Sequence, residues 1–281
     1  MANAQWLVPD WPAPAQVRAL FTTRGASPAD GASAAPFDHF NLGDHVGDAP
    51  DAVAANRARL AQALGGARPV FLNQVHGTAV SALDANQADG ATADGAVTTL
   101  PGVACTVMVA DCLPVLFTNA AGTAVAAAHA GWRGLVGGVL QATLTSFRAL
   151  ALRESARPAI NLEAIAEAEA ETEADAVLAW LGPCIGPRSF EVGAEVRDAF
   201  LATDAGATAC FAPHTPGKYL ADLPGLARRV LAGQGVRAVY GNDGSDAWCT
   251  VRDAQRFHSY RRDQAVRGGS GRMAACVWLA P

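Results

Sequence analysis

Short apolar runs separated by turn residues dominate the first half of the chain. A strand is expected at residues 17–23, and a closely spaced series at 69–75, 96–100, 103–110, 113–118 and 123–129. Apolar runs of roughly four to eight residues bounded by Gly, Pro, Asn or Asp are typical of buried strands. The series therefore predicts the sheet-forming centre of the protein.

Helical periodicity begins where this series ends. Leu135, Val139 and Leu144 recur at the spacing of one helix face, which predicts one long amphipathic helix after Trp132. Further helices are expected at 50–64, 191–201 and 222–233, and further strands at 177–181, 237–241 and 272–279.

No linker or internal repeat divides the sequence. Residues 1–281 are therefore expected to form a single domain of the α+β (mixed α/β) class, with mixed β-sheets flanked by helices. The stretch 161–176 is acidic and low in complexity, and we interpret it as a solvated insertion without chemistry.

Charge and composition narrow the class of function. With 21 Lys and Arg against 26 Asp and Glu, the net charge of −5 offers no basic field for nucleic acid or an anionic membrane. Lys218 is the one lysine and lies outside any phosphate-loop motif, which disfavours Schiff-base and P-loop chemistry. The six cysteines are scattered, and no secretory or membrane-spanning segment is recognisable. We therefore expect a cytoplasmic protein that acts on a small molecule.

Three short segments combine metal-binding side chains with turn residues. They are NQVHG with His76, ADCLPVLF with Cys112 and AAHAGWRG with His129, and each adjoins an expected strand. Two imidazoles and a thiolate suit zinc, and three protein ligands leave a fourth position open for catalysis. The alternative is that these side chains are packed core residues. Cys184 and Cys249 are candidates for a fourth ligand, although we expect both to be packing residues.

Two segments are candidate anion sites. The glycine-rich turn in HAGWRG leads into a helix that starts near Arg133, and free N–H groups at a helix start attract phosphate. These glycines could instead serve only helix-against-sheet packing. Residues 257–263 place arginines beside Phe257 and Tyr260, which suits phosphate binding and base stacking, or else a surface loop. Arg24 in FTTR is open to the same two interpretations.

Several motifs in order resemble those of the laccase-domain (YfiH-type) family. They are NQVHG, ADGAVTT, ADCLPVLF, HAGWRG, GPCIGP with FEVG, KYLADL, and FHSYRRD with a late GR. Members of that family are variously called polyphenol oxidase, purine nucleoside phosphorylase and peptidoglycan editing factor. The resemblance runs from about Phe21 to Arg272 and implies the family's mixed α/β fold, which is related to bacterial toxin deamidases. It also implies a zinc ion held by His76, Cys112 and His129.

The activity implied by this resemblance is phosphate-dependent cleavage of adenosine, inosine, guanosine and methylthioadenosine into base and ribose 1-phosphate, together with deamination of adenosine. Besides the three ligands, Asp111 is expected to move protons in catalysis. The candidates for binding substrate or phosphate are Arg24, Asn41, Gln74, Arg133 and Arg261. His258 stands where many relatives carry a second aromatic residue, which weakens the expected stacking on a base.

Two other activities remain open for the same residues. In one, Cys112 is the nucleophile and His76 or His129 the base of an amidase that acts on cell-wall precursors carrying L-serine. In the other, the site binds Cu²⁺ and oxidises phenols. The six histidines form no His-x-His pair, so sustained laccase chemistry is not expected.

A scaffold protein with structural zinc is disfavoured because such sites normally have four ligands. A monomer or weak homodimer is expected.

Overall fold

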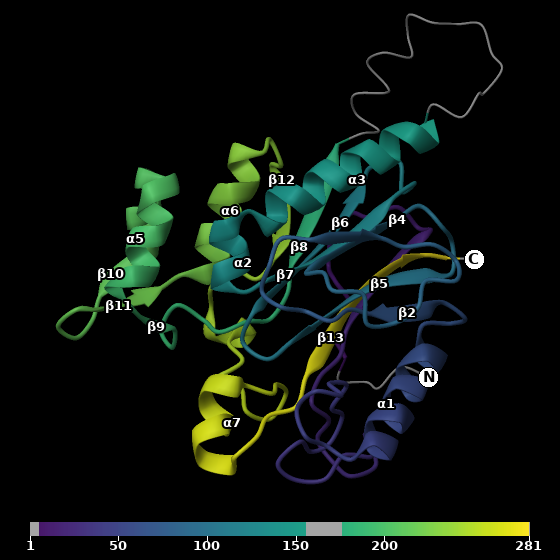
Figure 1. Ribbon diagram of the computed structural model, residues 1–281, viewed down its shortest axis with the longest axis horizontal. Helices are drawn as coiled ribbons and strands as arrows, with labels where there is room; N and C mark the ends of the chain where they lie inside the picture. Colours follow the sequence, from purple (N-terminus) through teal and green to yellow (C-terminus); the bar gives the residue numbers. More distant parts are fainter. Residues whose placement is uncertain (1–5, 156–175, 281) are drawn as a thin grey trace, which may run out of the picture.

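Two β-sheets packed face to face form the centre of the computed structural model, which describes residues 6–155 and 176–280 (Figure 1). The first sheet contains β1 (Val17–Phe21), β13 (Met273–Leu279), β5 (Val103–Val109) and β2 (Arg68–Phe71), in that order. The second contains β12 (Ala238–Gly241), β8 (Val177–Leu181), β6 (Leu113–Asn119), β7 (Val125–Ala130), β4 (Gly95–Thr98) and β3 (Val80–Ala82), in that order. Both sheets are mixed, because β2 runs parallel to β5, β12 to β8 and β3 to β4 while the other pairs are antiparallel.

The strands at the centre are covered on both faces. Every residue of β5, β6 and β7 is buried, which explains their continuous apolar sequence. Phe21 of the first sheet packs between the sheets against Leu116 and Trp180 of the second, and Phe257 joins them from the C-terminal segment. Burying side chains of this size stabilises the fold by about 1.5–3 kcal/mol each.

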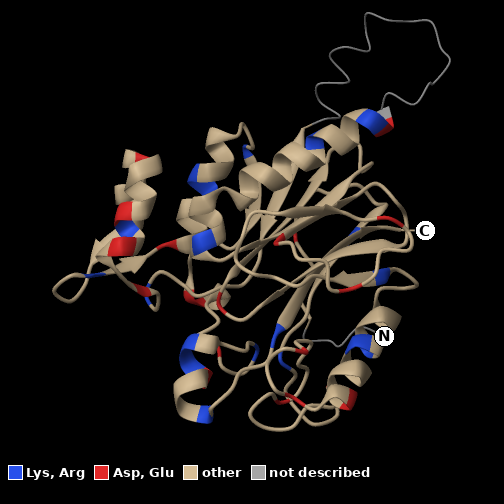
Figure 2. Ribbon diagram, viewed as in Figure 1, with Lys and Arg blue, Asp and Glu red and all other residues tan. Residues whose placement is uncertain are grey.

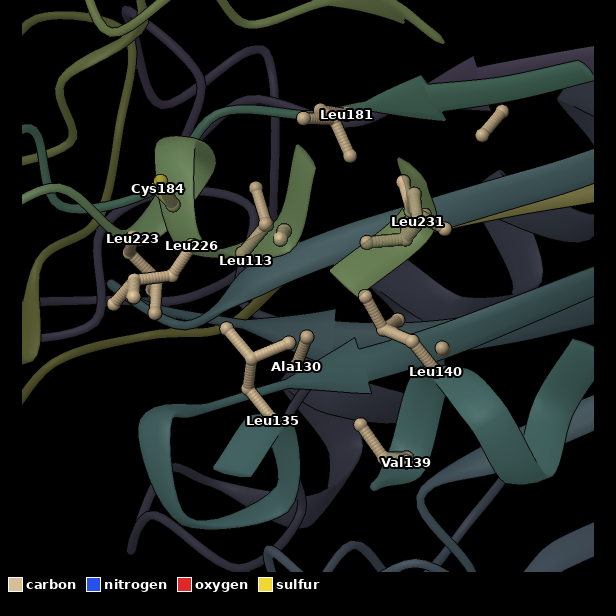
Figure 3. Close-up of a cluster of buried hydrophobic side chains, with 14 of the residues drawn as sticks. Leu113, Ala130, Leu135, Val139, Leu140, Leu181, Cys184, Leu223, Leu226 and Leu231 are labelled. Carbon is tan, nitrogen blue, oxygen red and sulfur yellow. The ribbon is translucent and has the colours of Figure 1, made fainter. Parts of the chain in front are cut away.

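Helices cover the outer face of the six-stranded sheet (Figure 1). They are α2 (Trp132–Gly137), α3 (Val139–Ser155) and α6 (Leu223–Gly233). Figure 3 shows the resulting cluster, in which Leu113 and Ala130 of the sheet gather with Leu135 of α2 and Leu226 of α6. On the opposite side of the molecule, α1 (Pro50–Ala63) packs on the four-stranded sheet through Leu60.

The remaining elements lie in the C-terminal half of the chain. A small antiparallel sheet has the order β10 (Phe211–Pro213), β11 (Lys218–Ala221) and β9 (Glu191–Gly193), and α5 (Ala194–Thr203) lies beside it (Figure 1). Two 3₁₀ turns, Ala205–Cys210 and Asp246–Trp248, and the helix α7 (Tyr260–Arg267) complete the described chain.

The α+β (mixed α/β) class predicted from the sequence is confirmed, as are most of the predicted strands and the helix at 50–64. One correction concerns the single helix expected after Trp132. The structure has two helices there, since α2 ends at Gly137 and Gly138 has a φ of +102° before α3 begins. Glycine adopts this left-handed conformation without steric cost and therefore ends a helix readily.

Two further differences lie in the C-terminal half. The helix expected at 191–201 begins only at Ala194, because the first three residues pair with β11 as β9. The segment 257–263 is not simply a loop, since it runs into α7, whose N-cap Ser259 accepts a hydrogen bond from the backbone N–H of Arg262. The acidic insertion expected at 161–176 lies, apart from its last residue, outside the described residues.

Charged residues lie mainly on the helices and loops, and the strands are almost uncharged (Figure 2). No helix within 6–155 and 176–280 is both long enough and apolar enough to cross a membrane.

Candidate active site

Two loops and the end of a strand bring His76, Cys112 and His129 together. His76 lies in the loop after β2, Cys112 in the turn between β5 and β6, and His129 near the end of β7. One ligand atom from each side chain lies within 4.8 Å of the other two, and Cys112 Sγ is 3.6 Å from His76 Nε2. Among the described residues no fourth His, Cys, Asp or Glu joins this group. Such a set could hold a metal ion and leave one position open.

The close approach of these side chains depends on Gly131. A Cβ atom at this position would lie 2.7 Å from His76 Cδ2 and 2.9 Å from Cys112 Sγ, closer than van der Waals contact allows. Gly134 is also restricted, since its Cβ would be 3.0 Å from the carbonyl oxygen of Gly77. These glycines therefore allow the loop of His76 and the Cys112 side chain to approach the start of α2, and an anion site at this helix start stays a prediction.

Asp94, which is fully buried just before β4, connects the two histidines. Its Oδ1 accepts hydrogen bonds from the backbone N–H of His76 (2.9 Å) and from Nδ1 of His129 (2.8 Å). Its Oδ2 accepts from the N–H groups of Val75 (3.2 Å) and Gly77 (2.7 Å). These bonds hold His76 at a φ of +61°, a left-handed conformation that is uncommon outside glycine. Because Nδ1 of His129 donates to Asp94, its Nε2 is left for a metal or for Cys112.

The ionised forms of Cys112, His129 and Asp94 stabilise one another. Burial opposes ionisation of Cys112, but the positive charge and hydrogen bond of His129, with the hydrogen bond of His76, lower the pKa of its thiol to about 6. Burial also opposes protonation of His129, but the Cys112 thiolate and Asp94 raise the pKa of its imidazole to about 9. The cluster therefore favours the thiolate, which is the form that binds metals or attacks electrophiles.

Asp111 stands immediately before Cys112, in a left-handed conformation with φ +89°. Its Oδ1 accepts a hydrogen bond from Thr250 Oγ1 (2.6 Å), and its Oδ2 accepts one from the backbone N–H of Arg261 (2.6 Å). Arg261 lies in the first turn of α7, where the helix dipole favours a negative charge. The Asp111 side chain also lines the cavity above the three ligand residues, so its carboxylate is held in one orientation beside any bound molecule.

A cavity of ≈ 280 Å³ opens over His76, Cys112 and His129. Trp132, Ile185 and Phe190 give it apolar walls, and Tyr260, Arg261 and Arg272 add polar and positively charged groups. Its volume is near the lower end of the roughly 300–1,000 Å³ typical of small-molecule sites. The cavity therefore suits a compact molecule with both apolar and polar faces.

The cavity contains only some of the other predicted site residues. Gln74 and Arg261 line it, although both ends of the Gln74 amide are bonded to the backbone of Met108. Arg24 does not line it. Its guanidinium donates to the side chain and carbonyl of Asp38 and to the carbonyl of Ala254, so these donors maintain the fold.

Arg133 and Asn41 also lie outside the cavity lining. The Arg133 guanidinium stacks 4.4 Å from the ring centroid of Trp132. Asn41 is fully buried, and its Oδ1 accepts a hydrogen bond from the backbone N–H of Arg272 (2.8 Å). Its link to the cavity therefore runs through Arg272, and its role in binding substrate or phosphate directly stays a prediction, as does that of Arg133.

Three further residues of the sequence analysis belong to the interior. Cys184 and Cys249 pair as an isolated β-bridge and are buried, and Cys249 Sγ accepts a hydrogen bond from the N–H of Gly186 at 3.2 Å. Phe257 lies between the two sheets, so the suggestion that it stacks on a base is wrong, because the inter-sheet core already encloses its ring. Tyr260, which is half exposed, lines the cavity instead.

Two important residues of the site received no role from the sequence alone. Asp94 is the aspartate of the ADGAVTT motif, and Arg272 is the arginine of the late GR motif. The motifs drew attention to both positions. Only the folded chain shows that one contacts both histidine segments and the other lines the cavity.

Comparison with known proteins places this chain in a family. The sequence profile of the family described as multi-copper polyphenol oxidoreductase laccase matches residues 18–160 and 151–280. A Pseudomonas aeruginosa protein named purine nucleoside phosphorylase is 48% identical over 275 residues, which cover 98% of each chain. The Escherichia coli protein named purine nucleoside phosphorylase YfiH is 47% identical over 274 residues, covering 97% of this chain and 98% of the other. A crystal structure from Neisseria meningitidis gives a TM-score of 0.81 at 44% identity, covering 99% of this chain and 100% of that one. The chain therefore belongs to the laccase-domain (YfiH-type) family.

Proposed function

We propose that this protein is a zinc-dependent purine nucleoside phosphorylase that also deaminates adenosine. The observation that carries the proposal is the open set of His76, Cys112 and His129 beneath a cavity of small-molecule size. The names of relatives that match nearly the full length of the chain supply the substrate class.

The donor atoms of the site fit zinc. One thiolate and two imidazole nitrogens are ligands that zinc accepts while keeping a fourth position open. His129 would bind through Nε2 with Nδ1 held by Asp94, and Cys112 would bind as the thiolate that its surroundings favour. When bound, the ion would supply Lewis acidity toward substrate or water. Copper accepts similar donors, and the measured metal content distinguishes the two.

The residues around the cavity support both reactions. In phosphorolysis, a phosphate oxygen bonds to ribose C1′ as the C1′–N9 bond breaks, and the purine takes up the electron pair and a proton. Trp132, Ile185 and Phe190 would enclose the purine and exclude water, and Tyr260 would stack beside it. Asp111, a carboxylate in the cavity lining, would move this proton. In deamination, a water oxygen bonds to C6 as the C6–N bond breaks, and Asp111 would pass a proton from the water to the leaving ammonia.

A second candidate is a cysteine-dependent amidase acting on L-serine-containing cell-wall precursors. Without a metal, Cys112, His129 and Asp94 form a chain of thiolate, imidazolium and carboxylate, as in cysteine hydrolases. This observation supports nucleophilic chemistry, but the names of the relatives favour the phosphorylase.

The test is to incubate purified protein of measured zinc and copper content with adenosine, with and without inorganic phosphate. We expect adenine and ribose 1-phosphate only with phosphate, inosine in both cases, and loss of all products on chelation with recovery on adding zinc. The opposite result is no product from any nucleoside, together with cleavage of a muramyl precursor that survives chelation and stops on thiol alkylation. That result would establish the amidase.

A further inference from the structure

Two guanidinium groups in the cavity lack a carboxylate partner. Arg261 and Arg272 both line it, and within 6–155 and 176–280 neither forms an ion pair with Asp or Glu. By contrast, the buried Arg24 pairs with Asp38 at 2.8 Å. The cavity therefore presents two guanidinium groups that no direct ion pair within the described residues neutralises.

The fold fixes Arg272 in place. Its backbone N–H donates to Asn41 Oδ1 at 2.8 Å, and its Nη1 donates to the carbonyl oxygens of Ser270 at 2.9 Å and Gly271 at 3.2 Å. Gly43 leaves room for its stem, since a Cβ there would lie 2.7 Å from Arg272 Cγ. No hydrogen bond from its Nε or Nη2 to any described residue occupies the rest of the guanidinium fork.

Arg261 lines the same cavity from the first turn of α7. Its Nη1 donates to the carbonyl of Glu191 at 3.1 Å, which ties α7 to β9, and its guanidinium lies 5.7 Å from the ring centroid of Phe190. The guanidinium of Arg272 lies 5.9 Å from the ring centroid of Tyr260. Carbonyl groups and aromatic faces hold the two cations without cancelling their charge.

Arg272 is partly buried, whereas Arg261 is exposed. Partial burial of an unpaired cation costs free energy, and an oxyanion in the cavity would offset that cost at Arg272. Burial indeed lowers the pKa of Arg272, against the opposing charges of Cys112 and Asp111. Asp111 is the one carboxylate that lines the cavity in the described part of the chain, and Thr250 and the N–H of Arg261 already bind its oxygens. Guanidinium forks bind phosphate oxygens in pairs, so a phosphate ion matches this arrangement best.

We propose that Arg272, together with Arg261, forms the seat for inorganic phosphate in this cavity, and that Asn41 positions Arg272. The proposal rests on the proposed phosphorylase function and assigns its second substrate to these residues. It places phosphate binding away from Arg24 and Arg133, which do not line the cavity.

The test compares R272Q and R261Q with R188Q, a change at an exposed arginine outside the cavity. Each zinc-loaded protein is assayed for phosphorolysis over a range of phosphate and, separately, for adenosine deamination, which needs no phosphate. R272Q should raise the KM for phosphate about tenfold or more, because charge-assisted bonds to the anion are lost, and deamination should fall much less than phosphorolysis. R272K keeps the charge without the fork and should show a smaller increase.

Asn41 supplies a test of positioning. N41A removes the acceptor for the Arg272 backbone and should raise the KM for phosphate while leaving the zinc content unchanged. If R272Q does not fold, R272K and R261Q carry the comparison. A phosphate KM that is unchanged in these variants, or that rises in R133Q instead, overturns the proposal. So does an equal loss of phosphorolysis and deamination.

Direct binding separates this proposal from the proposed function. Calorimetry of the zinc-loaded protein with phosphate, sulfate or acetate should show binding of phosphate and competition by sulfate, both weakened in R272Q. If the protein binds phosphate through Arg272 but forms no ribose 1-phosphate, the proposed function is wrong and the phosphate-binding site is confirmed. If phosphate does not bind, or acetate binds more tightly than phosphate, the proposed phosphate-binding site is wrong.

Discussion

Replacing Asp94 by asparagine tests how the metal ligands are held in place. The carboxylate accepts four hydrogen bonds, two at each oxygen: from His76 and His129 at Oδ1 and from Val75 and Gly77 at Oδ2. Asparagine keeps one acceptor oxygen and puts an NH₂ group in place of the other. With the oxygen kept toward Val75 and Gly77, the NH₂ faces Nδ1 of His129, which must then become an acceptor. The proton moves to Nε2, the nitrogen needed by the metal.

The size of the effect follows from these contacts. Loss of the partner that fixes a histidine ligand lowers metal affinity by roughly 10- to 100-fold, or about 1.4–2.7 kcal/mol. The N–H of His76 would also lose its acceptor, which costs about 1–3 kcal/mol of folding stability. D94N should therefore bind zinc more weakly and also unfold more readily.

Zinc affinity is measured by competition with a chromophoric chelator, and the His129 tautomer by ¹⁵N NMR. D263N is the matched control, because Asp263 is a buried multiple acceptor of hydrogen bonds that is not part of the metal-binding group. It should lower stability and leave zinc affinity unchanged. Wild-type zinc affinity in D94N, with Nδ1 of His129 still protonated, would refute the reasoning.

Three other changes have distinct expected results. G131A should reduce the zinc content to a small fraction of wild type, because the new methyl group would overlap His76 and Cys112. The control G233A, which has open space at its Cβ position, should retain zinc. Equal zinc contents in the two variants would contradict this. In chelated protein, the alkylation rate of Cys112 should rise with pH around a midpoint near 6, and a midpoint near the ordinary thiol value of 9.0 would show that the histidines do not stabilise the thiolate. Against the effect of burial, Arg267 and Arg24 lower the pKa of Asp38, so its ion pairs stabilise the fold at a pH above its ordinary value of 3.8 and stabilise it less as the pH falls below that value. D38N should therefore be less stable than wild type at neutral pH, and the difference should be smaller in acid. A difference in stability that does not depend on pH would contradict this.

The sequence was informative where local pattern decides structure. Continuous apolar runs identified β5, β6 and β7 because these strands are buried along their whole length. Short strands such as β3 and β9 have three residues each and depend on pairing with distant partners, so they carry too little local signal. The sequence did not reveal the break between α2 and α3 at Gly138, because the apolar residues before and after this glycine follow the same helical spacing.

The site shows the same limit. His76, Cys112 and His129 could be selected from residue type and motif, and the structure brings them together. The spacing of residues along the chain could not reveal that Arg24 is bonded to Asp38 while Arg272 lines the cavity. Assigning an arginine to an ion pair or to a ligand site needs the positions of carboxylates that are distant in sequence.

The most direct test of the central claim is the rate of ribose 1-phosphate formation from inosine as zinc is added back to metal-free protein in the presence of phosphate. We expect the rate to rise in proportion to zinc until one ion is bound per chain and then to stay constant, with no rise in C112S. A rate that is independent of bound zinc, or equal in C112S, would contradict the assignment of catalysis to this site.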